Sequence, residues 1–156
     1  MKLYVDMDGV IASFPFYDEQ FIKVGMYKPL AFRNLKARPL AKTINALAKT
    51  IDITIISACV SEHCKQEKIE WLAEYCPNIK KAILVNIGEN KAKAIGEINK
   101  DCFLLDDFSK NLEQWEKAGG TAIKVLNGKN DKSGKHYKIK IKTAEELRRV
   151  LAMEVI

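Results

Sequence analysis

The sequence has little proline, no long apolar run and no paired cysteine motif. Only 4 of its 156 residues are proline and 47% are hydrophobic, a composition that excludes a disordered chain. No apolar stretch approaches the roughly 20 residues that span a bilayer, and the N-terminus lacks the apolar core of a secretion signal. We therefore expect a cytoplasmic protein with one domain over residues 1–156 and no membrane partner.

The cysteine spacing and the net charge limit the kinds of site and binding partner that we expect. The four cysteines are Cys59, Cys64, Cys76 and Cys102. None forms a CxxC pair, so we expect free thiols rather than a zinc site or a disulfide framework. The net charge of +6 favours anionic partners. Many lysines fall on predicted helix surfaces, where they ordinarily face solvent and do not indicate a nucleic-acid site. We therefore favour a small phosphorylated substrate, and nucleic acid is the less favoured partner.

Hydrophobic patterning predicts an α/β fold. Short β-branched runs at 3–5, 53–56, 82–85, 102–105 and 121–126 alternate with helical patterns. This alternation is typical of a three-layer, Rossmann-like parallel sheet with helices on both faces. Residues 137–142 alternate strictly, with Tyr137, Ile139 and Ile141 inward and lysines outward, as in a protected edge strand. The aromatic-rich residues 14–38 fall outside the alternation and predict one or two short helices projecting from the sheet.

Capping residues mark three of the helices. Ser61 can cap a helix whose inner face carries Ile69, Leu72 and Ala73. Ser109 can cap a second helix, with Leu112 and Trp115 inward. Thr143 and Glu146 have the spacing of a capping box that opens the last helix.

Reactive side chains follow the predicted strands. They are Asp6 and Asp8 after the first strand, Ser57 and the backbone of Ala58 at the end of the second, Lys91 between the third and fourth, and Asp106 and Asp107 after the fourth. Ligands of open parallel sheets bind at the carboxyl ends of the strands, so we expect these groups to share one rim. Acids clustered there would repel one another without a cation, and Mg²⁺ is the hard ion that carboxylates and a phosphate hold.

Other interpretations of the same residues remain open. Asp and Gly are common turn residues, so Asp6-Met-Asp-Gly9 is also compatible with a plain turn. Asp106 and Asp107 could cap the helix near Ser109. Lys93 is the alternative to Lys91, which we prefer because it begins its helix.

The set of groups suits hydrolysis of a phosphate monoester. A carboxylate that attacks a phosphate needs positive charge nearby and a proton for the leaving oxygen. We expect Mg²⁺ and Lys91 to supply the charge, Ser57 and Ala58 to bind phosphate oxygens, and Asp6 to attack phosphorus. Asp8 would act first as general acid and then as general base.

Four segments resemble, in order, the motifs of the haloacid dehalogenase superfamily. They are Asp6-Met-Asp-Gly-Val10, Ile55-Ile-Ser57, Lys91 and Leu104-Leu-Asp-Asp107. Receiver domains combine similar residues, but there the acidic pair comes first and the lysine last. Within the superfamily, the chain resembles the 5′(3′)-deoxyribonucleotidase group and its small bacterial and phage relatives. The resemblance lies in Asp-Met-Asp-Gly-Val-Ile-Ala12, Phe32-Arg-Asn-Leu35 and Leu-Asp-Asp-Phe-Ser-Lys-Asn-Leu112.

The resemblance implies a phosphatase with an aspartyl-phosphate on Asp6. It also implies that Asp6, the backbone carbonyl of Asp8, and Asp106 bind Mg²⁺, with Asp107 orienting the metal's water shell. Residues 14–38 would be a short cap, in which the aromatics Phe14, Phe16, Tyr17 and Phe32 either stack on a base or form the cap's own core. The alternatives to a nucleotidase are a phosphatase of nucleic-acid ends or other small phosphates, and a non-catalytic phosphate-binding protein.

Overall fold

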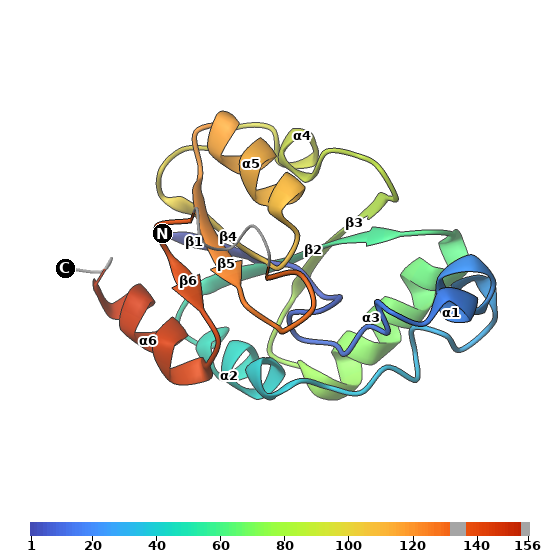
Figure 1. The fold of residues 1–156 in the computed structure, drawn as a ribbon. Helices are drawn as coiled ribbons and strands as arrows, with labels where there is room; N and C mark the ends of the chain where they lie inside the picture. Colours follow the sequence, from blue (N-terminus) through green and yellow to red (C-terminus); the bar gives the residue numbers. More distant parts are fainter. Residues whose placement is uncertain (132–136, 154–156) are drawn as a thin grey trace.

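The computed structural model describes residues 1–131 and 137–153 and shows a six-stranded, all-parallel sheet between two layers of helices (Figure 1). The strands, in the spatial order β3-β2-β1-β4-β5-β6, are β1 (Lys2–Val5), β2 (Asp52–Cys59), β3 (Lys81–Asn86), β4 (Cys102–Asp106), β5 (Thr121–Val125) and β6 (Lys140–Ile141). The helices are α1 (Glu19–Lys23), α2 (Pro39–Leu47), α3 (Glu62–Tyr75), α4 (Lys91–Ile95), α5 (Ser109–Lys117) and α6 (Ala144–Met153), with a 3-10 turn at Gly25–Tyr27. The predicted three-layer α/β fold is confirmed.

Alternate residues of the strands face two separate apolar cores. Leu3 and Val5 of β1 pack into the core beneath α2, α3 and α6, whereas Tyr4 faces the core beneath α4 and α5. Successive side chains of a strand point to opposite faces, which explains the continuous apolar runs of these strands. Trp115 of α5 packs on Tyr4, with ring centroids 4.9 Å apart.

Strand β6 lies at one edge of the sheet, as predicted for residues 137–142. Tyr137 and Ile141 are buried and Ile139 half-buried, while the intervening lysines are exposed. The strand itself has only two residues, fewer than the alternation suggested. Exposed lysines on such an edge discourage pairing with another chain.

The helix predictions need two corrections. The buried face of α3 consists of Cys64, Glu67, Lys68, Trp71 and Leu72, whereas Ile69 and Ala73 are exposed. Of the predicted face only Leu72 is buried, because the prediction followed the apolar residues alone and left out the charged residues Glu67 and Lys68. The N-cap of α5 is Phe108 rather than Ser109, which is the first helical residue. The capping box is confirmed, since Glu146 N–H donates to Thr143 Oγ1 and Thr143 N–H to Glu146 Oε2, both at 3.2 Å.

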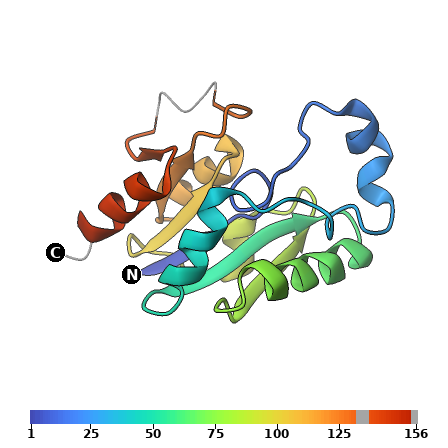
Figure 2. The same ribbon diagram turned by 90° about the horizontal axis from the view of Figure 1, so that it is seen from below.

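Residues 14–38 project beyond the sheet beside α3, with α1 and the 3-10 turn at their outer end (Figure 2). Phe14, Phe21 and Phe32 pack against one another, and Phe16 lies against Phe14 with ring centroids 4.9 Å apart. These rings therefore form a small core of the insertion. Trp71 Nε1 of α3 donates to the carbonyl of Leu35 at 2.7 Å, which attaches the insertion to the body.

Among residues 1–131 and 137–153, the structure has no helix with both the length and the apolarity needed to cross a bilayer.

Candidate active site

The loop after β1 brings Asp6 to the end of the central strand. Asp6 N–H donates to the carbonyl of Leu105 at 2.9 Å, which continues the pairing of β1 with β4 by one residue. The chain then turns sharply at Gly9, whose φ is +81°, a conformation that favours glycine. A Cβ at this position would lie 2.5 Å from Asp107 Oδ2, so only glycine permits the close approach of these two segments.

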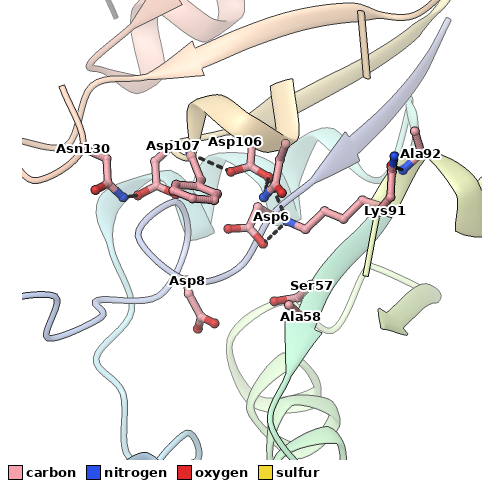
Figure 3. A network of polar contacts seen from close by, with 12 residues as sticks. Asp6, Asp8, Ser57, Ala58, Lys91, Ala92, Asp106, Asp107 and Asn130 are labelled. Carbon is pink, nitrogen blue, oxygen red and sulfur yellow. Dashed lines mark hydrogen bonds and ion pairs between the residues drawn. The ribbon is translucent and has the colours of Figure 1, made fainter. Parts of the chain in front are cut away.

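Three buried carboxylates converge between β1 and β4 (Figure 3). Asp6, Asp106 and Asp107 each place one oxygen so that all three oxygens lie within 4.8 Å of one another. The neighbours of β1 are β2 and β4, and chain connections leave toward opposite sides at this point. In open parallel sheets such a switch point is where ligands bind.

Lys91 lies among these acids. Its Nζ is 2.6 Å from Asp6 Oδ1 and 2.8 Å from Asp106 Oδ2, and the side chain is buried. Asn90 caps α4 by accepting from Ala92 N–H, which places Lys91 at the first helical position. Burial disfavours the ammonium, but Asp106 and Asp6 outweigh it and raise the pKa of Lys91 above its usual value. Lys93, two residues further along the same helix, is exposed.

The electrostatics of the acids favour a bound cation. Burial raises the pKa of Asp6 to about 8, because Lys91 only partly offsets the desolvation and the neighbouring acids oppose a further negative charge. Burial and Asp106 likewise raise the pKa of Asp107 to about 6, although Asn130 and Asn127 each donate to its Oδ2 at 2.7 Å. Oxygen ligands in this arrangement fit a hard divalent ion such as Mg²⁺.

Asp8 points away from the three acids (Figure 3). Its Oδ2 accepts a hydrogen bond from Lys68 Nζ at 2.6 Å, and Lys68 also donates to Ser57 Oγ at 2.9 Å and to the carbonyl of Ala58 at 2.8 Å. Asp8 Oδ1 is buried and has no hydrogen-bond partner among the described residues. The side chain of Asp8 therefore belongs with Ser57 and Ala58 rather than with the acid cluster, and its predicted role as a metal ligand concerns its backbone carbonyl.

Sequence reasoning missed several polar residues of the site. Lys68 could have been found from its position, four residues after Cys64 and three before Trp71, because a lysine in a buried helical stripe needs an anionic partner. Asn127 and Asn130 follow β5, at the rim where the other candidates were sought. Asn111 Nδ2 donates to Asp106 Oδ2 at 2.9 Å, and the buried Lys124 donates to the carbonyl of Asp107 and to Ser109 Oγ.

The sequence profile of a protein family described as 5′ nucleotidase, deoxy (pyrimidine), cytosolic type C protein matches residues 14–147. The chain belongs to this family. The part of this chain that matches the family includes Ser57, Lys91, Asp106 and Asp107. Asp6 lies before the matched part. No curated protein sequence matches the chain.

Solved structures confirm the fold of the superfamily. The D,D-heptose 1,7-bisphosphate phosphatase from B. bronchiseptica, in complex with magnesium and phosphate, is 12% identical, with a TM-score of 0.71 over 99% of both chains. A haloacid dehalogenase-like hydrolase from Streptococcus pneumoniae is 10% identical, with a TM-score of 0.71 over 96% of this chain and 97% of that one. The heptose bisphosphate phosphatase from Burkholderia thailandensis is 15% identical, with a TM-score of 0.66 over 97% and 99%. The family and the fold together make this member of the nucleotidase family a phosphatase of the haloacid dehalogenase type.

Proposed function

We propose that the protein is a Mg²⁺-dependent nucleotidase that hydrolyses phosphate monoesters through an aspartyl-phosphate on Asp6. The observation that carries the proposal is the convergence of Asp6, Asp106 and Asp107 around one point, with Lys91 Nζ 2.6 Å from Asp6. A buried carboxylate at the end of the central strand, with cationic groups beside it, is placed to attack an electrophile that carries negative charge.

Asp6, Asp106 and Asp107 would hold the metal through their oxygens. When bound, Mg²⁺ would supply positive charge against the phosphoryl oxygens. The chain itself offers Lys91 and Lys68 as cations and Ser57 Oγ as a hydrogen-bond donor on the same rim. These groups would orient the phosphate in line with Asp6 and reduce its repulsion of the attacking carboxylate.

Two chemical steps would follow from this placement. In the first, an Asp6 oxygen attacks phosphorus, the bond from phosphorus to the ester oxygen breaks, and Asp8 gives its proton to the leaving oxygen. In the second, water attacks the phosphorus and transfers a proton to Asp8, the bond from phosphorus to Asp6 breaks, and inorganic phosphate leaves. Lys68 would hold Asp8 in place during both steps, because it fixes Oδ2 and leaves Oδ1 without a protein partner among the described residues.

Family membership and the insertion at 14–38 support a nucleotide as the substrate. Phe14, Phe21 and Phe32 contact one another, which favours the interpretation that they form the core of the insertion. Tyr17 and Phe108 are large aromatic residues that stay exposed, and either could contact a base.

Hydrolysis of a substrate panel tests the proposal. The panel contains mononucleotides, sugar phosphates and end-phosphorylated oligonucleotides, each with Mg²⁺ and with EDTA. We expect release of phosphate from mononucleotides that requires Mg²⁺ and is lost in Asp6→Asn. Asp52→Asn is the matched control, because Asp52 is exposed, begins β2 and pairs with Lys81 far from the site. An Asp6→Asn variant as active as the parent would contradict the proposal, and hydrolysis of oligonucleotide ends alone would favour the alternative substrate.

A further inference from the structure

Glu67 of α3 is a buried carboxylate outside the acid cluster. Its side chain is 4% exposed. It accepts backbone N–H groups of the insertion, from Leu30 at 2.5 Å, Phe32 at 2.8 Å and Arg33 at 3.2 Å. His63 Nε2 lies 2.8 Å from Glu67 Oε1. Three backbone donors on one carboxylate compensate its burial and fix this part of the insertion on α3.

The segment that Glu67 holds is strained. Leu30 has a φ of +65°, in the left-handed region that non-glycine residues rarely adopt. A residue stays in such a conformation only where its surroundings hold it there, and the Leu30 N–H bond to Glu67 is such a restraint. Without Glu67 we expect this segment to relax away from α3.

The position of the segment matters for the site because Glu67 and Lys68 are neighbours on α3. Glu67 binds the N–H of Phe32, and the ring of Phe32 lies 4.8 Å from Lys68 Nζ, which holds Asp8 and Ser57. The same segment lies along α3 in Figure 2.

The aromatic contacts continue from Phe32 to the loop after β1, which carries Asp6. Phe32 packs on Phe14, and Phe14 packs on Phe16. The ring tip of Phe16 would lie 2.7 Å from a Cβ at Gly9, so it borders the turn that follows Asp6. A shift of Phe32 would therefore be transmitted through packed rings to Phe16, at the end of the insertion that lies next to this turn.

We propose that Glu67 is a positioning residue that fixes the insertion over the phosphate site and thereby sets the affinity for the leaving group of the substrate. The inference rests on the proposed function, because it assumes that the insertion contacts the part of the substrate that leaves. Glu67 itself touches neither Asp6 nor Lys91 and takes no part in the chemical steps.

Steady-state kinetics of Glu67→Gln test the inference. A glutamine can place its single acceptor oxygen on only one side, so either the Leu30 bond or the bonds of Phe32 and Arg33 are lost. We expect KM for the nucleotide to rise about tenfold, as for the loss of one hydrogen bond to a charged acceptor, with kcat within about twofold. KM for acetyl phosphate, which has a small leaving group, should stay within about twofold.

Two further variants serve as a control and as a conservative substitution. Glu74→Gln is the matched control, since Glu74 is exposed and pairs with Arg33 of the same segment, so its loss should change KM little. Glu67→Asp keeps the charge but shortens the side chain, so its KM should lie between those of the parent and of Glu67→Gln. This variant replaces Glu67→Gln in the test if the glutamine variant folds poorly. Hydrogen exchange of the Leu30, Phe32 and Arg33 amides should accelerate in both Glu67 variants and not in the control.

A fall in kcat with unchanged KM would overturn the inference, and so would unchanged kinetics despite faster exchange of the three amides. If the parent hydrolyses acetyl phosphate but no nucleotide, the nucleotide proposal fails separately. The Glu67 comparison then uses the bulkiest monoester that the parent accepts, and an equal KM in parent and variant again refutes the positioning role.

Discussion

Replacing Lys91 with methionine should separate the two cations that the acid cluster can hold. Methionine has a similar length and no charge, so the variant removes the ammonium and leaves the buried volume filled. In the parent, Lys91 Nζ lies 2.6 Å from Asp6 and 2.8 Å from Asp106 in a buried environment. Its loss leaves buried carboxylates without their counter-charge.

The expected destabilisation follows from that burial. Removing one partner of a buried ion pair costs about 3–5 kcal/mol. For a chain of this size each kcal/mol shifts Tm by roughly 2–4 °C. In EDTA, the Tm of Lys91→Met should therefore fall by roughly 6–20 °C. Mg²⁺ should stabilise the variant more than the parent, because the unpaired acids bind the ion more tightly and binding to the folded state raises stability.

The assay is thermal unfolding in EDTA and in Mg²⁺, with phosphatase activity measured in parallel. Activity in Mg²⁺ should fall about 10²- to 10³-fold, as for loss of one charge-stabilising group. Lys93→Met is the control, because Lys93 is exposed on the same short helix. The reasoning is refuted if both variants unfold within about 2 °C of each other in EDTA, or if Mg²⁺ raises the Tm of Lys91→Met no more than that of the parent.

Three further predictions concern neighbouring residues. Asp6 has a pKa raised to about 8, so the folded state holds its proton more tightly than the unfolded state. The Tm of the metal-free protein should therefore fall as pH rises from about 4 to 8. Thermal unfolding over a series of pH values should show a smaller fall for Asp6→Asn. Asp8→Asn should lower kcat by about 10²- to 10⁴-fold while the variant still binds Mg²⁺, which turnover and calorimetry would check. Gly9→Ala should cost about 1–3 kcal/mol in the free energy of unfolding, measured in urea, because its φ is +81° and the new Cβ would meet Asp107.

Strands β1, β2, β4 and β5 were predictable because they are buried on both faces and therefore read as nearly continuous apolar runs. The rule that ligands bind at the carboxyl ends of parallel strands then predicts that Asp6, Ser57 and Asp106 share one rim. The helix start at Asn90 explains why Lys91 rather than Lys93 reaches the acids. These predictions depend on local patterns and on one topological rule.

The face of α3 could not be predicted from apolarity. Its buried surface includes Glu67 and Lys68. The backbone groups that donate to Glu67 lie 34 to 37 residues away in sequence, and Asp8, which pairs with Lys68, lies 60 residues away. The helical position of Lys68 indicates that it needs an anionic partner, but the pattern of the helix does not identify the distant residues that bury these charges. The asparagines after β5 were missed for a related reason, since amides carry no charge to mark them as part of an acidic site.

The buried charges connect these residues into one electrostatic argument. Four carboxylates, those of Asp6, Asp8, Asp106 and Asp107, share the rim with three buried ammonium groups, those of Lys68, Lys91 and Lys124. Fully ionised, the set carries one excess negative charge, and the raised pKa of Asp6 shows that the protein without a metal favours a proton there. A divalent cation would reverse the excess to positive, and a phosphate dianion would reverse it again. Each ion therefore compensates the charge left by the other, so Mg²⁺ and phosphate should each increase the affinity for the other by the same factor.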